Sequence, residues 1–350
     1  MMQRHFRGYN FIGIPELGLT YRWGEHLSEN PDMAPWPELA DISISNYCIN
    51  DCQYCYRSSD KSGAFMSLED YEFLMKELSC AEYGPVFQVA LGGGEPLLHP
   101  DFNEILKITR EKYDIIPNYT TSGKFFNAEN IKATKDYCGA IAISYDPYRD
   151  YLSLEELQKL GEKLRNKHLK VNIHFVVSEK TIPMATQILQ GKYDEYMNVF
   201  NSIIFLTFKP GGRGQSKDSI KSPELLESFL KSVNQTKSTI KFGFDACFVP
   251  ALLKFSKIDV DLIDSCECGF FSVYINEKLN VMPCSFCNDP QYIFNLKEYS
   301  FYDIWKHKFS KYRQFITEHG QESCDDCEES LECRGQCPFF DELFLCDIIN

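Results

Sequence analysis

The chain has 350 residues, 44% of them apolar and 25% charged, which is ordinary for a globular protein with a sizeable core. Fifty acidic against 36 basic side chains give a formal net charge of -14. This charge disfavours nucleic-acid binding, because phosphate recognition needs a concentrated basic surface. No apolar run approaches the length of a membrane span, and the first residues lack the apolar core of a secretory signal. We therefore expect a cytoplasmic protein with neither membrane nor nucleic-acid partners.

Strands and helices are expected to alternate after a Gly-, Pro- and aromatic-rich extension over residues 1–38. The predicted helices include one that Ser67 caps and one with a Ser153/Glu156 capping box. Six strand–helix units are fewer than the eight of a closed barrel, so the pattern predicts a partial (β/α)6 TIM-like barrel over residues 39–238, with catalytic groups at the carboxyl ends of its strands. The predicted strands, rich in Val and Ile, are residues 41–46, 85–95, 115–123, 139–146, 170–178 and 202–214.

Fifteen cysteines are many for such a chain, and they are unevenly distributed. Three lie at 48–55 and nine lie between 266 and 346, whereas Cys80, Cys138 and Cys247 stand alone. In a reducing compartment, clustered cysteines more often ligate a metal or an iron–sulfur cluster than form disulfides.

The first cysteine group, Cys48, Cys52 and Cys55 in "CINDCQYC", has one ligand fewer than a structural zinc site needs. In a 4Fe-4S cube, three thiolates leave one iron open for a small-molecule ligand. The stretch resembles the signature of the radical S-adenosylmethionine (SAM) superfamily, in which SAM binds that iron and is reductively cleaved to a 5′-deoxyadenosyl radical. The resemblance implies that Tyr54 stacks beside the adenine. The alternative is an incomplete zinc loop with a distant fourth ligand.

The second motif is "LGGGEP", at the end of the next predicted strand. Glycines let backbone groups approach a ligand closely, and a glutamate supplies a counter-charge to an ammonium. Gly93, Gly94 and Glu95 are similar to the Gly-Gly-Glu segment of the same family. The resemblance implies that they hold the methionine amino group of the cofactor.

Shorter matches follow in chain order. Ser122 stands in a segment that resembles the family's Thr-Asn-Gly strand end, and Ser144 lies where a ribose-contacting serine is often found. Asn172 and His174 share one face of the fifth predicted strand, so Asn172 is a candidate for contacting the cofactor, although a hydrogen-bonded core pair explains both residues as well. Arg213, in "KPGGRG", is the candidate for binding the cofactor's carboxylate.

The C-terminal part, residues 239–350, is similar to the SPASM domain, which carries auxiliary iron–sulfur clusters. The similarity rests on the order of its cysteines and on Ile304, Trp305 and Arg313 in the segment that joins them. It implies two auxiliary 4Fe-4S clusters, and hence three cubes with the SAM-binding one. A zinc ribbon is the alternative, although so many cysteines without an interleaved histidine favour iron–sulfur.

The resemblance also implies the ligand sets. Cluster I takes Cys268, Cys284 and Cys337, with either Cys266 or Cys287 as the fourth ligand, which the sequence leaves open. Leu279 stands where the family usually has glycine. Cluster II takes the remaining cysteines of the group, which are Cys324, Cys327, Cys333 and Cys346.

Together these motifs imply a radical SAM oxidoreductase or maturase that abstracts a hydrogen atom from a peptide or protein substrate. The alternatives are a radical dehydrogenase or carbon–carbon bond-forming enzyme on a small molecule, and a non-enzymatic electron-transfer or zinc-binding interaction protein. A flavodoxin- or ferredoxin-type reductant is the expected electron source. Because residues 1–38 are short for a leader-binding domain, we expect a separate leader-peptide-binding protein or a leaderless substrate.

Cys247, in "FGFDACF", lies at the junction of the two predicted domains, and the family's substrates lie near that junction. We expect its thiol to return a hydrogen atom to a substrate radical. A strand is also expected at "IKFGF", just before Asp245. If that strand extends to Cys247, Asp245 lies on the same face and is the candidate proton acceptor. The alternative is that Cys247 only packs, as free cysteines commonly do.

Overall fold

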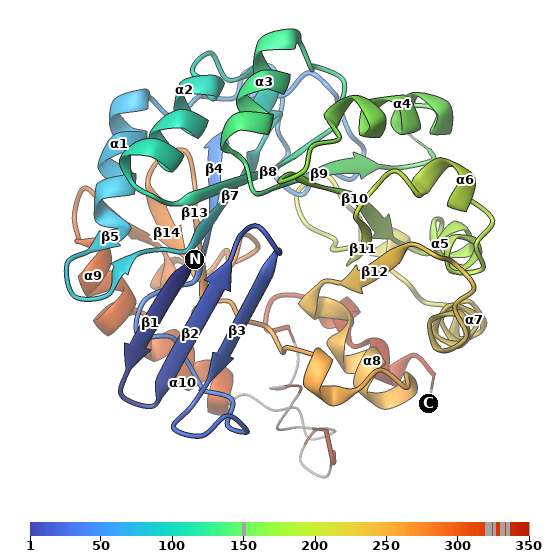
Figure 1. Ribbon diagram of the computed structural model, residues 1–350. Coiled ribbons are helices and arrows are strands. Elements are labelled where there is room, and N and C mark those ends of the chain that lie inside the picture. Colours follow the sequence, from blue (N-terminus) through green and yellow to red (C-terminus); the bar gives the residue numbers. More distant parts are fainter. Residues whose placement is uncertain (149–151, 319–323, 325–326, 330–332, 334–336, 350) are drawn as a thin grey trace.

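The computed structural model describes residues 1–148, 152–318, 324, 327–329, 333 and 337–349 (Figure 1). Its centre is a large sheet in which seven neighbouring strands run parallel, in the order β12-β11-β10-β9-β8-β7-β4. The predicted parallel α/β architecture is therefore confirmed. These strands are β4 (Leu39–Ser45), β7 (Gln88–Gly93), β8 (Ile116–Thr121), β9 (Ala140–Tyr145), β10 (Lys170–Val177), β11 (Ser202–Thr207) and β12 (Lys241–Phe244).

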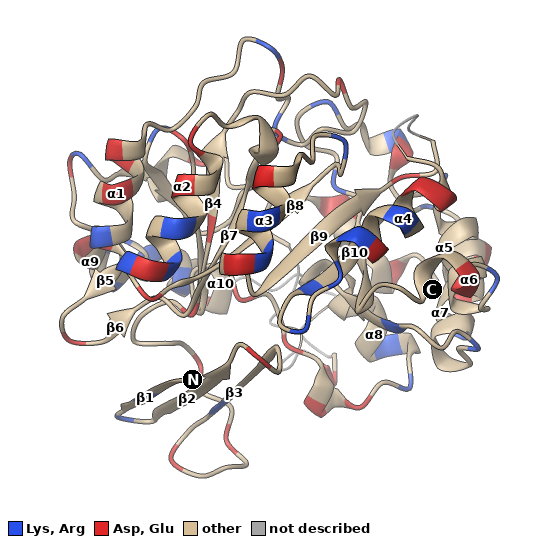
Figure 2. Cartoon of the chain, turned by 45° about the horizontal axis from the view of Figure 1, so that its top comes forward, with Lys and Arg blue, Asp and Glu red and all other residues tan. Residues whose placement is uncertain are grey.

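Helices cover one face of this sheet, because alternate strand residues are apolar and fully buried beneath them. The Ser67 hydroxyl accepts from the Asp70 amide at 3.0 Å, and the predicted Ser153/Glu156 capping box forms. Acidic and basic residues are interspersed along the outer helices (Figure 2). The helices are α1 (Leu68–Glu77), α2 (Phe102–Lys107) with its π-helical continuation (Ile108–Lys112), α3 (Ala128–Tyr137), α4 (Leu154–Leu164), α5 (Ile182–Leu189), α6 (Asp194–Met197) and α7 (Pro223–Asn234).

The N-terminal residues form a small antiparallel sheet that the sequence did not predict: β1 (Met2–Phe6), β2 (Tyr9–Ile14) and β3 (Leu19–Trp23). It lies below the large sheet in Figure 1. Phe11 of β2 packs edge-on against Phe87, which precedes β7, with ring centroids 5.4 Å apart. The small sheet therefore covers the amino-terminal end of the barrel strands.

The Cys-rich part extends the same sheet. Strand β13 (Ser272–Ile275) pairs parallel with β4, and β14 (Asn280–Met282) and β15 (Phe294–Asn295) follow antiparallel. The helices of this part are α8 (Val249–Phe255), α9 (Phe301–Asp303), a π-helical turn (Ile304–Lys308) and α10 (Ser310–Glu318). Shorter elements are β5 (Ser79–Cys80), β6 (Gly84–Pro85) and single 3-10 turns at Pro96–Leu98, Ser216–Asp218, Ala246–Phe248, Val260–Leu262, Pro290–Tyr292, Asp341–Leu343 and Leu345–Asp347.

The Ile-Trp…Arg pattern has a structural explanation. Ile304 and Trp305 are fully buried, and the Arg313 guanidinium lies over the Trp305 ring, 4.6 Å from its centroid. Arg313 donates to the carbonyls of Trp305 and Gly269, each at 2.7 Å. The arginine thereby fixes the turn that follows Cys268. Among the described residues, no helix combines the length and the apolar content that a membrane span requires.

Candidate active site

The first cysteine loop leaves the carboxyl end of β4 and folds back on itself. The Cys48 amide donates to the Asp60 carbonyl at 2.9 Å, and the Ser59 amide donates to the Cys55 sulfur at 3.4 Å. Cys48 lies close enough to Cys52 and Cys55 for electrostatic interaction, and burial raises the pKa of its thiol. None of the three cysteines is in a disulfide, so the loop carries three candidate sulfur ligands.

The segment after β11 clamps this loop. Arg213 donates from Nε to the Cys52 carbonyl at 2.8 Å and from its guanidinium to the Ser59 carbonyl at 3.0 Å. Gly212 has a φ of 59°, and a Cβ there would collide with the carbonyls of Cys55 and Tyr56. These contacts give Arg213 a role that the sequence did not indicate; its predicted contact with the cofactor's carboxylate stays a prediction.

The glycine turn after β7 lies against the same strand end. The Gly94 amide donates to the Ser45 carbonyl at 2.7 Å, and the Glu95 amide donates to the Tyr47 carbonyl at 3.0 Å. Gly93 has a φ of 110°, and a Cβ on it or on Gly94 would collide with the β4 backbone. Glycine is therefore required for the turn to approach the cysteine loop.

Glu95 is almost completely buried and accepts four hydrogen bonds. Its Oε1 accepts from the Thr121 hydroxyl at 2.6 Å and the Leu97 amide at 3.2 Å. Its Oε2 accepts from the Ser122 amide at 2.9 Å and the Ser122 hydroxyl at 2.6 Å. Burial raises the pKa of Glu95, although these donors oppose the shift. Two predicted site residues, Glu95 and Ser122, thus meet, and an ammonium group would have to share or replace one of these bonds.

The face of the sheet opposite the helices lines an open lumen with small and polar side chains. Ser144 pairs in register with His174, and Ser122 directly follows Thr121, which pairs with Ile143. Ser122, Ser144 and His174 therefore lie at one level near the carboxyl ends of their strands. A Cβ on Gly92 would meet no atom within 4 Å, so the lumen is open beside the glycine turn.

Asn172 lies two residues before His174 on the same face of β10, and its side chain accepts hydrogen bonds from its neighbours. Its Oδ1 accepts from the Ser202 hydroxyl at 2.8 Å and the Asn201 amide at 3.2 Å. Burial lowers the pKa of His174 to about 4, so this imidazole is neutral at pH 7. Its Nδ1 lies 3.5 Å from the Thr120 hydroxyl.

Tyr54 is half-buried and packs edge-on against Phe208, with ring centroids 5.4 Å apart. It lines a second cavity of about 540 Å³ together with Arg213 and the glycines beside it. The ring therefore lies between the cysteine loop and the end of β11. The predicted stacking on an adenine stays a prediction.

These residues fit the cofactor that the sequence motifs imply. Three cysteines outside any disulfide lie on one loop, an amide already donates to one sulfur, and the lumen beside Gly92 is open. A cube bound through three thiolates keeps one iron for a further ligand. The arrangement can hold such a cube at the mouth of the barrel.

A second group of thiols lies in the C-terminal part. Cys268 exchanges side-chain hydrogen bonds with Cys266 and with Cys284, and Cys337 interacts electrostatically with Cys284 and Cys266. Cys287, the other candidate for the fourth ligand, is buried and directs its thiol to the Asp289 carbonyl at 4.0 Å. These interactions favour Cys266 over Cys287 as the fourth predicted ligand of cluster I.

The cluster II cysteines are less completely described. Cys346 lies close enough to Cys324 for electrostatic interaction, and burial raises the pKa of Cys346 to about 11. The Cys327 amide donates to the Cys324 carbonyl at 3.2 Å. The segments between Cys324 and Cys337 lie in part outside the described residues, so the set of four remains a prediction.

Cys247 and Asp245 lie where β12 meets the C-terminal part. Strand β12 ends at Phe244, so Asp245 caps the following 3-10 turn instead of continuing the strand to Cys247. Burial raises the pKa of the Cys247 thiol, which interacts electrostatically with Lys209, Asp245, Cys266 and Cys337. The thiol therefore lies between the barrel rim and the proposed cluster I ligands.

Lys209 is a site residue that the sequence did not single out. Its ammonium donates to Asp245 at 2.5 Å and to the Thr207 carbonyl at 3.0 Å. Burial by itself lowers its pKa, but the Asp245 carboxylate and the nearby thiols Cys247 and Cys284 outweigh burial, and the net shift is upward. The sequence did hold a signal for Lys209, which begins the "KPGGRG" motif at the end of a predicted strand. Only the arginine of that motif was assigned a role.

Arg57 and Glu277 form a second pair that the sequence did not predict. Arg57 follows the cysteine loop, and its guanidinium lies 2.6 Å from the Glu277 carboxylate, which also accepts from the Ser43 hydroxyl at 3.0 Å. Their side chains are only 13% and 6% exposed. Because 220 residues separate them, no local pattern marks the pair.

Two protein-family models match the chain. The first, described as the radical SAM superfamily, matches residues 42–150, which include the cysteine loop, the glycine turn and Ser144. The second, an iron–sulfur cluster-binding domain called SPASM, matches residues 266–328. The two matched segments thus hold the first cysteine group and the start of the second.

The curated relatives have several activities. A 7,8-dihydro-6-hydroxymethylpterin dimethyltransferase of Methanocaldococcus jannaschii is 30% identical over 42% of this chain and 31% of its own length. A probable GTP 3′,8-cyclase of Methanocella arvoryzae is 35% identical over 26% of this chain and 29% of its own length. The chain thus spans less than a third of these two relatives. An AdoMet-dependent heme synthase of Methanosarcina barkeri is 23% identical over 85% of this chain and 90% of its own length.

Solved structures share the fold at low identity. SuiB of Streptococcus suis bound to precursor peptide SuiA has a TM-score of 0.65 and 19% identity, covering 87% of this chain and 72% of that one. Native anSMEcpe with bound AdoMet and Cp18Cys peptide has a TM-score of 0.62 and 18% identity, covering 86% and 89%. With the three-thiol loop, the glycine turn and the C-terminal cysteines in place, the chain matches the radical SAM superfamily over residues 42–150 and the SPASM iron–sulfur domain over residues 266–328.

Proposed function

We propose that the protein is a radical SAM oxidoreductase or maturase that takes a hydrogen atom from a peptide or protein substrate. The observation that carries the proposal is the three-thiol loop at the carboxyl end of β4, open to a lumen of small and polar side chains. The peptide assignment is supported by the fold shared with SuiB and anSMEcpe, whose structures hold peptides, and by a cavity of about 1370 Å³ below the barrel. A flavodoxin or ferredoxin supplies the electron, and a separate protein presents any leader peptide.

In this proposal the chain's own residues bind and orient SAM and the substrate, and they exclude water from the site. When bound, the cube at Cys48, Cys52 and Cys55 supplies the electron that cleaves SAM to a 5′-deoxyadenosyl radical. The glycine turn and Glu95 receive the methionine end of SAM, since a buried carboxylate is a strong acceptor for an ammonium. Further contacts to SAM are assigned to Tyr54, Ser122, Ser144, Asn172 and Arg213, which lie around the lumen and its rim.

Two auxiliary 4Fe-4S clusters complete the proposal, giving three in all. Cluster I is assigned four thiols whose interactions with one another support the grouping, and cluster II is assigned the later set. Residues 39–238 then form the radical SAM barrel and residues 239–350 the SPASM domain, with residues 1–38 as an N-terminal extension. The ligand sets are Cys266, Cys268, Cys284 and Cys337 for cluster I, and Cys324, Cys327, Cys333 and Cys346 for cluster II.

Cys247 is proposed as the hydrogen donor that quenches the substrate radical: its S–H bond breaks as a C–H bond forms on the substrate, and one electron from the flavodoxin or ferredoxin with one proton from water restores the thiol. Its thiol is protonated, because burial raises its pKa, so it carries a transferable hydrogen. Asp245, held by Thr207 and Lys209, is the nearby proton acceptor. Replacing Cys247 by alanine should leave 5′-deoxyadenosine formation intact while product yield falls or the product changes. Product formed at the wild-type rate would leave Cys247 as a packing residue.

A small-molecule substrate is the second candidate. The curated relatives with pterin, GTP and heme in their names favour it, since they share sequence with this chain. Mass spectrometry of substrate and product separates the two candidates. A change of mass in a peptide supports the first proposal, and turnover of a small molecule supports the second.

The test of the radical proposal is anaerobic reconstitution followed by two measurements. Wild type should bind about twelve irons per chain as three cubes, and dithionite should drive slow release of 5′-deoxyadenosine from SAM. A triple alanine variant of Cys48, Cys52 and Cys55 should lose about a third of the iron and all SAM cleavage. A double alanine variant of Cys80 and Cys138, outside every proposed ligand set, is the matched control and should retain both.

Two outcomes contradict the proposal. SAM cleavage that survives in the triple variant would remove the loop from the chemistry. About four irons per chain in well-reconstituted wild type, unchanged after deletion of the C-terminal part, would refute the auxiliary clusters.

A further inference from the structure

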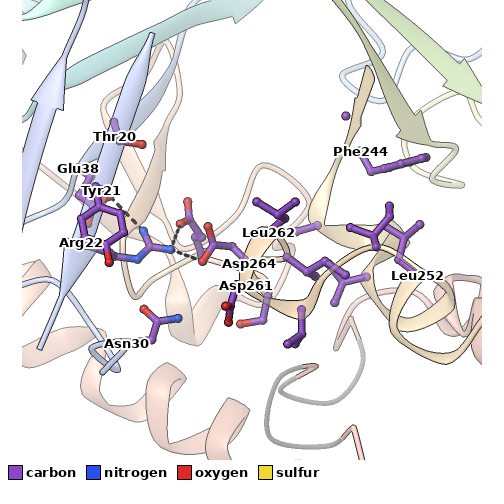
Figure 3. Close-up of a pocket in the computed structure, with 18 of the residues that line it drawn as sticks. Thr20, Tyr21, Arg22, Asn30, Glu38, Phe244, Leu252, Asp261, Leu262 and Asp264 are labelled. Atoms are coloured by element: carbon purple, nitrogen blue, oxygen red, sulfur yellow. Dashed lines mark hydrogen bonds and ion pairs between the residues drawn. The ribbon is translucent and has the colours of Figure 1, made fainter. Parts of the chain in front are cut away.

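A cavity of about 1370 Å³ lies between the N-terminal sheet and the open edge of the barrel (Figure 3). Residues of β3 and the loop after it form one wall, and β12, α8 and residues 258–267 form the other. Leu39 and Gln88, which begin β4 and β7, also line it. The cavity therefore opens at the amino-terminal end of the barrel lumen, away from the cysteine loop.

The cavity is strongly acidic. Seven carboxylate side chains line it, against a single basic one, Arg22. Arg22 is already shared by three of them: it lies 3.1 Å from Glu38, 2.7 Å from Asp264 and 2.6 Å from Glu267 (Figure 3). A fourth carboxylate, Asp245, is paired with Lys209 outside the lining, so the acidic side chains still outnumber the basic ones and the cavity favours a positively charged occupant.

The wall also presents exposed apolar side chains. Leu262 is 79% exposed, Leu27 is 71% exposed and Tyr21 is 50% exposed, and all three line the cavity. Apolar side chains exposed this far around an acidic cavity are typical of a surface that receives a larger ligand. A peptide segment with cationic side chains matches both properties.

Asp41 lies deeper in the lumen than Leu39 and the other residues that line this cavity. It follows Leu39 by two residues on the lumen face of β4, opposite Ala90 of β7 and Tyr274 of β13. Its side chain is exposed to the lumen although the protein encloses it deeply. It makes no side-chain hydrogen bond or ion pair to any residue that the structure describes, and the one charge acting on it is the like charge of Glu267.

The position along the strand puts Asp41 on the path from the cavity to the cofactor. Each strand residue advances about 3.3 Å, so Asp41 lies ~7 Å above Leu39. Ser43, the next residue on the same face, pairs with Gly92, where the lumen opens beside the glycine turn. Asp41 thus presents a carboxylate to the lumen midway between the two, without a side-chain partner among the described residues.

We propose that Asp41 receives the cationic side chain, lysine or arginine, of a peptide substrate that enters through the acidic cavity. The inference rests on the peptide substrate of the proposed function and adds a specificity-determining residue to it. The chain's excess of acidic side chains around this entrance attracts the peptide, and Asp41 fixes the register of the cationic residue below the radical site. Asp41 is a binding residue in this proposal and takes no part in hydrogen transfer.

The test is fluorescence anisotropy with a labelled (Gly-Arg)3 hexapeptide on anaerobically reconstituted protein. The matched probe is (Gly-citrulline)3, which has nearly the same shape without the charge. Wild type should bind the arginine peptide about tenfold more tightly than the citrulline peptide, because the charged hydrogen bonds are lost. Asp41→Asn should remove most of this preference, whereas Glu69→Gln, which changes an exposed carboxylate on α1, should retain it.

Two results overturn the inference: equal affinity of wild type for both peptides, or an undiminished preference in Asp41→Asn. The outcome is separable from the radical proposal, because SAM cleavage by wild type is measured without any peptide. Loss of SAM cleavage would contradict the radical proposal, whereas the role of Asp41 would still be decided by the peptide-binding result.

A stability measurement distinguishes a binding role from a structural one. Burial, and then the charge of Glu267, raise the pKa of Asp41 to about 7; Tyr56 and Tyr274 are the other titratable groups beside it. A raised folded-state pKa gives stability that is present below the unfolded pKa and lost as pH rises through about 7. Without peptide, Asp41→Asn should therefore melt above wild type at pH 8.5, and the difference should shrink at pH 5.5. A variant that melts below wild type at both pH values would show a structural carboxylate.

Discussion

Glu95 illustrates how one side chain can serve the cofactor and the fold together. The sequence predicts it as a counter-charge, but the structure also makes it the link between the ends of β7 and β8, through Thr121 and Ser122. A carboxylate with four donors is held in one orientation. Such preorganisation reduces the cost of binding, since no side chain has to be ordered when the ligand arrives.

We predict that Glu95→Ala lowers both stability and SAM affinity. Four donors lose their acceptor, two of them backbone amides, so the free energy of unfolding should fall by about 2–3 kcal/mol. SAM affinity should fall by about 1.5–3 kcal/mol if Glu95 bonds the ammonium. Urea titration and equilibrium dialysis with labelled SAM measure the two effects. Ser144→Ala is a control that should leave stability near wild type.

Glu95→Gln separates the two roles. The amide keeps one oxygen acceptor, so it can accept from only one of the backbone amides of Leu97 and Ser122, and it carries no charge. A variant with weakened stability and unaltered SAM affinity would restrict Glu95 to the fold.

At the scale of elements, the cysteine loop depends on a segment far along the chain. The sequence predicts Arg213 for a carboxylate of the cofactor, whereas in the structure its guanidinium spans the carbonyls of Cys52 and Ser59. A planar guanidinium can bond two acceptors at once, which an ammonium on a flexible stem does poorly. The loop is thus shaped before any iron is bound.

We predict that Arg213→Lys fails to hold the loop although it retains the charge. Iron bound at Cys48, Cys52 and Cys55 should become labile, and up to about a third of the total should be lost on gel filtration. Arg110→Lys, on the outer helix layer, is the matched control and should retain its iron. If Arg213→Lys keeps all iron but binds SAM weakly, the arginine acts on the cofactor and not on the loop.

The turn between β13 and β14 carries a second departure from the family pattern. Leu279 stands where glycine is usual and adopts a φ of 62°, the left-handed region that glycine occupies without strain. The backbone conformation is therefore retained, and leucine accepts the strain. Its side chain is 1% exposed and packs in the main core, which explains why leucine is tolerated.

We predict that Leu279→Gly destabilises the protein. Relief of the left-handed strain gains about 1–2 kcal/mol, whereas removal of a fully buried leucine costs about 2–5 kcal/mol. The free energy of unfolding should therefore fall by about 1–3 kcal/mol. Thermal or urea unfolding monitored by circular dichroism measures it. A higher free energy of unfolding in the variant would show that relief of the backbone strain outweighs the loss of the buried side chain.

At the scale of the whole molecule, local patterns account for the sheet but not for its assembly. Each parallel strand was predictable because Val and Ile runs such as residues 170–178 end at recognisable turns. The N-terminal sheet was not, because β3 is largely exposed and shows no apolar alternation. Thr121 and Ser122, two partners of Glu95, lie 26 and 27 residues away, and Glu277, which pairs with Arg57, lies 220 residues away, so no local pattern identifies these contacts.

Asp41 shows the same limit for the site, because its strand face could be predicted and its surroundings could not. In "LADISIS" the alternation of polar and apolar residues marks Asp41, Ser43 and Ser45 as one face of a strand. That this face lines a lumen, and that the carboxylate has no partner among the described residues, follows only from the assembled barrel. The cysteine motifs could be found in the sequence because their ligands are close together along the chain.

Arg57, Glu277 and Ser43 join the two halves of the molecule. Arg57 follows the cysteine loop, Ser43 belongs to β4, and Glu277 lies in the turn of the C-terminal part. The ion pair is mostly buried, so each charge depends on the other for its stability. The loop that binds the first cluster is therefore mechanically connected to the part that holds the proposed auxiliary clusters.

We predict strong coupling in a double-mutant cycle on this pair. Arg57→Ala or Glu277→Ala alone leaves a buried charge without its partner and should lower the free energy of unfolding by about 3 kcal/mol. The double variant should fall short of the summed losses by at least about 1 kcal/mol, because neither charge is then left unpaired. Urea unfolding of anaerobic protein measures the four corners of the cycle.

The control is the surface pair Lys112 and Glu72, whose side chains are 53% and 37% exposed. Water solvates both of these charges, so their cycle should show no measurable coupling. If the Arg57–Glu277 pair fixes the cysteine loop, the single variants should also release iron from the first cluster faster than the control variants do. Additive losses of stability in the cycle, with iron retained in both single variants, would contradict the connection and leave the two halves joined by the β4–β13 pairing alone.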